Sequence, residues 1–396
     1  MKLSQRIMAI KPSATLAVDA KAGELKAQGK DVISFGAGEP DFISPEAAFA
    51  YARRAMDEGR THYPPTPGIP ELRREISDYY KRRFGLPVEP AQIVVGCGAK
   101  PMIYEALAAI VDAGDEVILL APTWVSYIEQ IRLVDGKVVV VDTEKTNFVP
   151  DLQMTEQAIT PRTTAILLNS PSNPTGIMYG EDILRGLGAL AVKHDLWLIW
   201  DEIYEQLVYG ENRHFHPLQL MPELAERIIT INGVSKTYAM TGWRIGYAWG
   251  PRKVMDKINA FQSHLTSGAT SIAQWAALGV MRESEADMRK MRDAFQARRS
   301  LICGLLAVMP LISFPEPQGA FYVFINIKNC LNKSYKGQLL QDDIEFCAAL
   351  LEAELVAVVP GSAFFAPGYL RVSYATGEDA IREGMSRLRR FLEEIK

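Results

Sequence analysis

The chain has 396 residues, of which 48% are hydrophobic and 23% are charged, and its formal net charge is -4 at pH 7. This length predicts two or three domains, or one large and one small lobe. The slight negative charge and the lack of any basic block or arginine-rich stripe argue against a nucleic-acid partner.

The first ten residues lack an apolar signal core, and the apolar runs elsewhere have the length of strands rather than of membrane spans. The cysteines show neither disulfide nor zinc-site spacing, and we expect them to be reduced: Cys97, Cys303, Cys330 and Cys347. His214 and His216 have no third ligand cluster nearby, so a loop histidine pair is favoured over a metal site. We therefore expect a soluble cytoplasmic protein with no metal and no membrane partner.

Between residues 91 and 250, short apolar runs alternate with longer amphipathic segments. The predicted strands are residues 93–95, 116–120, 137–141, 165–168, 196–200, 228–231 and 245–249. Segments 101–111 and 183–194 have the helical period, and this alternation predicts a doubly wound α/β domain with a mostly parallel sheet. No clear helix lies between residues 231 and 245, which indicates that at least one strand joins differently.

After Gly250 the pattern becomes helical, with long helices predicted at residues 272–281 and 283–309. Residues 319–325 and 369–374 are then predicted as strands of a second, smaller α+β lobe. The chain shows no internal repeats and no low-complexity tracts.

Polar side chains follow three of the predicted strands. Asn173 lies in a proline-containing turn after strand 165–168, Asp201 and Tyr204 follow strand 196–200, and Lys236 follows strand 228–231. Strands of a parallel sheet are apolar on both faces, and ligands bind beyond their carboxyl ends. The sequence therefore predicts that an amide, a carboxylate, a phenol and an amine meet at one rim.

Lys236 carries the most informative chemistry. An amine must lose its proton to attack a carbonyl, and burial beside the cation of Arg244 disfavours the ammonium form. A solvated loop lysine is the alternative for an isolated Ser-Lys pair. The neighbouring strand ends favour pyridoxal phosphate, with Lys236 for the aldehyde, Asp201 for the pyridine nitrogen, and Asn173 and Tyr204 for the ring oxygen.

A phosphate needs backbone amides at a helix start and a cation. The turn 96–100, which includes Ala99 and Lys100, supplies the amides, although such turns are common in α/β proteins. Arg371 lies inside an apolar run, where a guanidinium either grips a carboxylate or forms a structural ion pair. Trp124 follows strand 116–120 and is either a core residue or a platform for an aromatic ring.

Four motifs occur in order with a family's spacing: Gly38-Glu39-Pro40-Asp41-Phe42, Asn173-Pro174-Thr175-Gly176, Asp201-Glu202-Ile203-Tyr204, and Ser235-Lys236 through Arg244. With them, the chain resembles the class I/II aminotransferases of the fold-type-I pyridoxal-phosphate enzymes, and most closely their bacterial aspartate aminotransferase branch. The resemblance runs from Lys11 to Ala375.

The resemblance implies a large cofactor domain at residues 42–285 and a discontinuous small α+β domain at 286–396, against which residues 1–41 pack. It implies cofactor contacts from these residues: Ala99, Lys100, Trp124, Asn173, Asp201, Tyr204, Ser235, Lys236 and Arg244. Arg371 matches the arginine that holds the substrate's α-carboxylate, near Gly38, with Trp124 and Asn173 also next to the substrate. Gly233 departs from several relatives, which carry a serine there, so one phosphate hydrogen bond is expected to be missing.

In that branch, Lys100 and Thr15 match residues that lie where a distal carboxylate binds. The implied reaction is ping-pong transamination, EC class 2.6.1, from aspartate to 2-oxoglutarate, with Lys236, Asp201 and Tyr204 as catalytic residues. A homodimer is implied too, because Tyr63 matches a tyrosine that reaches the neighbouring subunit's cofactor phosphate.

Several alternatives remain open at this point. The donor or acceptor could be prephenate, an aromatic amino acid or alanine, and the same fold also serves C-S lyases. A transcription regulator would need a DNA-binding module, for which the residues before Gly38 are expected to be too few.

Overall fold

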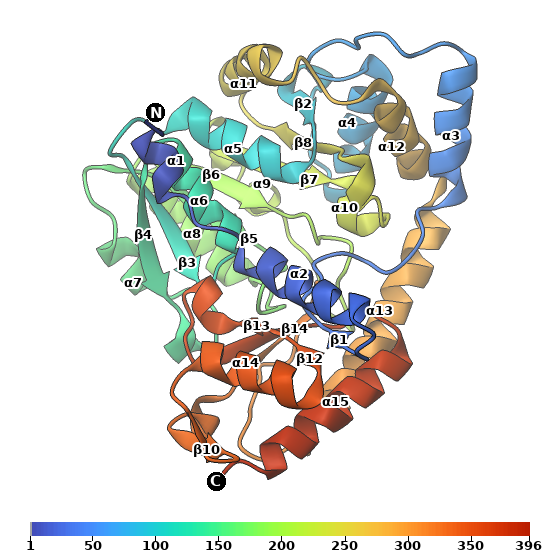
Figure 1. Cartoon of the computed structure of the whole chain (residues 1–396). Helices are drawn as coiled ribbons and strands as arrows, with labels where there is room; N and C mark the ends of the chain where they lie inside the picture. The colour runs from blue at the N-terminus through green and yellow to red at the C-terminus, as the bar shows by residue number, and fades with distance from the viewer. Residues whose placement is uncertain (1) are drawn as a thin grey trace.

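The computed structural model describes residues 2–396. Its centre is a seven-stranded sheet in the order β2-β8-β7-β6-β5-β3-β4 (Figure 1). The strands are β2 (Ile93–Gly96), β3 (Glu116–Ala121), β4 (Lys137–Asp142), β5 (Thr163–Asn169), β6 (Trp197–Asp201), β7 (Ile228–Gly233) and β8 (Gly246–Trp249). All seven predicted strands are present, within one or two residues at each end. Strand β8 alone runs opposite to the other six strands. This agrees with the lack of a predicted helix between residues 231 and 245, which indicated a different connection.

Helices cover both faces of this sheet because its strands alternate apolar side chains toward each face. On β5, Ala165 and Leu167 pack into the cluster under one layer, and Ile166 and Leu168 pack into the cluster on the other. The first layer holds α5 (Ala99–Ile110), α6 (Val125–Leu133) and α11 (Arg252–Leu265). The second holds α8 (Glu181–Lys193), α3 (Glu46–Asp57), α4 (Pro70–Phe84) and α12 (Ser271–Glu283).

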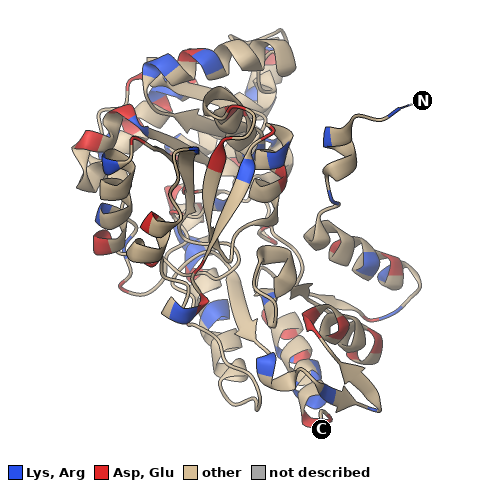
Figure 2. Ribbon diagram, turned by 90° about the vertical axis from the view of Figure 1, so that its left-hand side faces the viewer, with Lys and Arg blue, Asp and Glu red and all other residues tan. Residues whose placement is uncertain are grey.

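Short elements complete the large lobe. They are α7 (Leu152–Gln157), α9 (Pro217–Leu220) and α10 (Val234–Thr237), with 3₁₀ helices at Pro90–Gln92, Glu144–Thr146, Pro222–Glu226 and Thr241–Trp243. Charged residues of both signs are interspersed along the outer helices (Figure 2). Among residues 2–396, no helix combines the length and the apolar character that crossing a bilayer requires.

A smaller lobe is built from the C-terminal third of the chain. It contains a three-stranded antiparallel sheet, in the order β13-β14-β9, flanked by helices. Its elements are α13 (Glu285–Leu306), β9 (Tyr322–Asn326), β10 (Lys333–Tyr335), β11 (Gln338–Leu340), α14 (Asp343–Glu354), β12 (Val356–Ala357), β13 (Val359–Pro360), β14 (Tyr369–Ser373) and α15 (Glu378–Glu393), with 3₁₀ helices at Lys328–Cys330 and Gly361–Phe364. The two predicted helices 272–281 and 283–309 are present as α12 and α13, which meet at Ser284.

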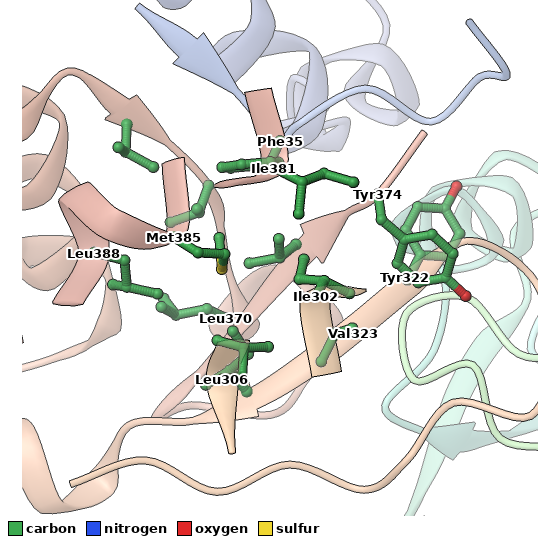
Figure 3. Close-up of a cluster of buried hydrophobic side chains, with 14 of the residues drawn as sticks. Phe35, Ile302, Leu306, Tyr322, Val323, Leu370, Tyr374, Ile381, Met385 and Leu388 are labelled. Carbon is green, nitrogen blue, oxygen red and sulfur yellow. The ribbon is translucent and has the colours of Figure 1, made fainter. Parts of the chain in front are cut away.

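The N-terminal segment is shared between the lobes, whereas all of it was expected on the smaller one. Helix α1 (Gln5–Ala9) contacts α6 of the large lobe. Helix α2 (Ala14–Ala27) and strand β1 (Ile33–Ser34) pack on the smaller lobe, where β1 pairs in parallel with β12. Phe35 is fully buried in the same cluster as Leu370 and Ile381 (Figure 3). We propose domain boundaries on these contacts, with residues 42–285 as the large domain and residues 286–396 together with 1–41 as the small one.

Glu105 is a buried carboxyl group of the large lobe. It lies on α5, which packs against β8 and α11, and it is only 1% exposed. Neither carboxyl oxygen has a hydrogen-bond partner among residues 2–396. Burial therefore raises the pKa of Glu105 to about 8.

Replacing Glu105 by glutamine is expected to stabilise the protein increasingly as pH rises. The pKa of Glu105 is higher in the folded than in the unfolded state. Its contribution to folding stability is therefore fully present below about pH 4.5 and is lost as the pH rises through about 8. At pH 9 we expect a gain on the order of 1–4 kcal/mol, measured by thermal melting from pH 5 to 9. Glu352→Gln, at an exposed position on α14, is the control; equal pH profiles for Glu105→Gln and wild type would contradict the assignment.

Candidate active site

A cavity of about 380 Å³ lies at the carboxyl ends of the sheet strands, where the two lobes and α2 meet. Every predicted site residue except Tyr63 lines it: Thr15, Gly38, Ala99, Lys100, Trp124, Asn173, Asp201, Tyr204, Ser235, Lys236, Arg244 and Arg371. Tyr63 lies on the loop between α3 and α4 and is 91% exposed. Residues from both ends and the middle of the chain therefore form one site.

Lys236 lies in α10, directly after β7, and is half-buried. Its Nζ donates a hydrogen bond to the carbonyl of Gly38. Burial, opposed by Glu39 and helped by the nearby cations Arg244, Arg371 and Lys100, lowers the pKa of Lys236 to about 8. At pH 7 about a tenth of the amine is therefore neutral and nucleophilic, far more than for a solvated lysine.

Asp201 is the last residue of β6 and is 3% exposed. Its Oδ2 accepts a hydrogen bond from the Tyr127 hydroxyl at 2.6 Å, and its Oδ1 accepts one from the Ile203 amide at 3.1 Å. It forms no ion pair with any side chain of residues 2–396, and burial raises its pKa to about 6. A buried carboxylate in this setting is stabilised by a cation that comes from outside the chain.

The turn between β2 and α5 places a helix start next to a guanidinium. Helix α5 begins at Ala99, and Gly98 before it has a φ of 108°, which glycine adopts readily. The Arg244 guanidinium lies against Gly98, so closely that a Cβ there would collide with it. A helix start and a guanidinium together favour a phosphate.

Gly233 is explained by packing at this turn. A Cβ at this position would lie 2.9 Å from both the Cα of Gly246 and the carbonyl oxygen of Ile245. Strands β7 and β8 approach each other too closely here for a serine without a backbone shift. Steric contact therefore explains why a glycine stands here. The expected loss of one phosphate hydrogen bond stays a prediction.

Arg371 lies on β14 and is 1% exposed. Its Nη2 donates to the carbonyl of Gly36 at 2.6 Å, and its Nη1 donates to Oδ1 of Asn173 at 3.2 Å, whereas Nε has no partner. The guanidinium carbon lies 4.6 Å from the centroid of the Tyr322 ring. Because no acidic side chain of residues 2–396 pairs with it, the structural ion pair is excluded, and a ligand carboxylate fits the site.

Lys100 supplies a further cation on another wall. Its Nζ lies 4.8 Å from the centroid of the Trp124 ring, and burial, followed by Arg244, lowers its pKa. Trp124 directly precedes α6, and its indole packs edge-on against Tyr127. Thr15, on α2, shares a hydrogen bond of 2.8 Å with Ser13.

Four ionisable residues that line the cavity were not predicted: Asp19, Glu39, Tyr127 and Tyr322. The Tyr322 hydroxyl lies 2.9 Å from that of Tyr204, so the two phenols share a hydrogen bond. Tyr322 belongs to an apolar strand and Tyr127 to an amphipathic helix, and neither pattern separates a site residue from a core residue. Glu39 is part of a quoted motif, and Asp19 lies one helical turn after Thr15, so those two had a usable signal.

The histidine pair lies in the loop that precedes α9, as expected, and both side chains are buried. The Nε2 of His214 lies 2.9 Å from a carboxyl oxygen of Glu202, and the Nε2 of His216 lies 3.0 Å from the hydroxyl of Thr230. The rings therefore have different partners. No group of three or more potential metal ligands occurs in the part of the chain that the structure describes.

The comparisons with known proteins agree with this geometry. The family model described as aminotransferase class I and II matches residues 30–388. The aspartate aminotransferase of Geobacillus stearothermophilus is 45% identical over 99% of both chains, and the aspartate/prephenate aminotransferase of Thermus thermophilus is 44% identical over 98% of both. The crystal structure of Thermus thermophilus aspartate aminotransferase with maleate superposes with a TM-score of 0.93 at 43% identity, covering 99% of this chain and 100% of that one.

Proposed function

Since the chain belongs to the class I and II aminotransferases, we propose that it transfers the amino group of aspartate to 2-oxoglutarate, giving oxaloacetate and glutamate. The fold is that of the fold-type-I enzymes, and members of this family depend on pyridoxal phosphate. The substrate is the part of this proposal that the family alone leaves open.

One observation carries the choice of a dicarboxylic substrate. Arg371 and Lys100 place two cations in one cavity, on elements of different lobes, and neither forms an ion pair within residues 2–396. Aspartate and 2-oxoglutarate each carry two carboxylates, which fit two separate cations. The names of the relatives support aspartate as the amino donor.

The residues present fit pyridoxal phosphate. Asp201 is a buried carboxylate without a cation, the turn at Ala99 with Arg244 and Ser235 fits a phosphate, and Lys236 is an amine of lowered pKa. When bound, the cofactor withdraws electrons from the substrate's α-carbon, so that the α-proton can leave.

The chain's own groups then have separate tasks. Arg371 and Asn173 orient the substrate through its α-carboxylate, and Asp201 keeps positive charge on the pyridine ring. Trp124 supplies a flat face and Tyr204 a hydroxyl beside Tyr322. Lys236 holds and moves a proton at Nζ, and its pKa of about 8 suits that task near neutral pH.

A donor and acceptor screen on the purified, cofactor-loaded protein tests this proposal. We expect the highest kcat/KM for aspartate among aspartate, alanine and phenylalanine, with 2-oxoglutarate as acceptor. A preference for alanine or phenylalanine would overturn the aspartate assignment. Release of ammonia and pyruvate without any acceptor would instead show a C-S lyase.

Prephenate is a second keto acid that the screen should include as an amino acceptor. The Thermus thermophilus relative is named for both aspartate and prephenate. Lys100 is a mobile point charge rather than a rigid fork, so it can follow a bulkier acid. Amino transfer to prephenate at a rate similar to that with 2-oxoglutarate would extend the proposed function.

Replacing Lys100 by alanine is expected to lower kcat/KM for aspartate by on the order of tenfold, while the value for alanine changes little. The reason is that Lys100 has no acidic partner and its charge is available to a distal carboxylate. Lys253→Ala, at an exposed position on α11, is the control. An unchanged preference for aspartate over alanine would remove Lys100 from the specificity argument.

A homodimer with shared sites is also proposed. Tyr63 is 91% exposed and Ile43 is 86% exposed, and Tyr63 does not reach the cavity of its own chain. A second copy of the chain is the partner that would bury them and place Tyr63 near a cofactor phosphate. Sedimentation is expected to show a dimer, and Tyr63→Phe is expected to weaken cofactor binding; a fully active monomer would refute the shared site.

The cytoplasmic location also stays a prediction of the sequence. Cell fractionation with antibody detection tests it directly, and recovery in the membrane or the extracellular fraction would contradict it.

A further inference from the structure

Helix α2 contributes one face to the active-site cavity. Thr15 and Asp19 are four residues apart on this helix, so they lie on the same face, and both line the cavity. Asp19 is thereby a carboxylate inside a site that the proposed function assigns to carboxylate substrates.

The position of Asp19 is fixed by the strand beside it. The Ser34 hydroxyl donates to its Oδ1 at 3.4 Å, and a Cβ built on Gly36 would lie only 2.5 Å from the same oxygen. The carbonyl of Gly36 in turn accepts the hydrogen bond from Nη2 of Arg371. Asp19 and Arg371 therefore both lie next to Gly36.

Asp19 and Arg371 form no direct ion pair, although their charges interact. Groups from each neighbouring element influence the ionisation of Asp19: Ser34 on β1, Glu39 after β1, Tyr322 on β9 and Arg371 on β14. Burial raises the pKa of Asp19, with Glu39 adding to the increase, whereas Arg371 and Ser34 lower it. Lys100 and Lys236 line the same cavity from the opposite lobe.

We propose that Asp19 is a specificity-determining residue that weakens the binding of dicarboxylates when ionised and admits them when protonated. The inference rests on the proposed function, in which one carboxylate binds Arg371 and the other binds near Lys100 and Thr15. A ligand that spans these places passes along the inner face of α2, next to Asp19. Like charges repel there, and a protonated Asp19 can donate a hydrogen bond instead.

The inference predicts how binding depends on pH. As pH rises and Asp19 ionises, affinity for a dicarboxylate falls relative to a monocarboxylate of the same length. In Asp19→Asn that dependence disappears, because the amide stays neutral and donates a hydrogen bond at every pH.

The test is equilibrium binding of succinate and butyrate to the cofactor-loaded protein, by calorimetry from pH 4.5 to 8. At pH 8, Asp19→Asn is expected to bind succinate on the order of tenfold more tightly than wild type, with butyrate changed much less. Glu24→Gln removes a charge from the exposed face of the same helix and is the control. Equal succinate affinity for wild type and Asp19→Asn at pH 8 overturns the inference.

The outcome is separable from that of the donor screen. If the screen shows no aspartate preference and Asp19→Asn still tightens succinate binding, the substrate proposal fails and the role of Asp19 stands. If aspartate is preferred and Asp19→Asn leaves the affinity ratio of succinate to butyrate unchanged from pH 4.5 to 8, the role of Asp19 fails alone.

Discussion

Replacing Lys236 by alanine is expected to abolish turnover, with a loss of at least about 10⁴-fold in kcat, because the site then has no group to move the α-proton. The cavity keeps the turn at Ala99, Arg244 and Asp201, so the variant is expected to bind the cofactor without a covalent bond. Borohydride reduction followed by peptide mapping measures this directly. In wild type the cofactor should be found on the peptide that contains Lys236, and in the variant on none.

Lys236→Arg is the matched control for charge. It keeps a cation beside Gly38 but cannot lose its proton near neutral pH, so it is expected to be as inactive as the alanine variant. Cofactor on another lysine of the wild-type protein, or measurable turnover in Lys236→Arg, would show that the assignment is wrong.

Replacing Asp201 by alanine or asparagine is expected to lower kcat by on the order of 10²- to 10³-fold. The carboxylate lies in a buried position where its charge is poorly screened, so losing it removes stabilisation of the positive pyridine ring. Asp201→Glu keeps the charge and is expected to retain part of the activity. Near-normal turnover in Asp201→Asn would contradict this role.

Thermal melting of the cofactor-free Asp201→Asn variant gives a second measurement of this role. The pKa of Asp201 is about 6 when folded, so its contribution to stability is fully present below about pH 3.8 and is lost as pH rises through about 6. At pH 8 the cofactor-free Asp201→Asn protein is expected to be more stable than wild type by on the order of 1–3 kcal/mol. Added cofactor should stabilise wild type more than the variant, because only wild type gains a charge partner for residue 201.

The sheet was predictable because its strands are apolar on both faces. The runs from β2 to β7 are bounded by turn residues and separated by helices, and a parallel arrangement brings their carboxyl ends to one rim. The convergence of Asn173, Asp201 and Lys236 followed from that rule alone. The placing of Arg371 did not, because β14 belongs to another sheet, and its position depends on how the two lobes pack.

The residues that were missed show where sequence reasoning stopped. Tyr127 was hidden in an amphipathic helix, and its hydrogen bond to Asp201 depends on how α6 lies against β6. Asp19 lies on a helix with one buried residue, Ala22, so no apolar stripe showed which of its faces points inward. In both cases tertiary packing decides the role, and the spacing of Asp19 from Thr15 was the one usable signal in the sequence.

The most direct test of the account is a single half-reaction. The cofactor-loaded protein is mixed with aspartate alone, and the products are counted against the number of active sites. We expect one oxaloacetate per site and no ammonia, with the amino group retained until 2-oxoglutarate is added and then released as one glutamate per site. Continued product formation without a keto acid, or release of ammonia, would contradict amino transfer as the function of this site.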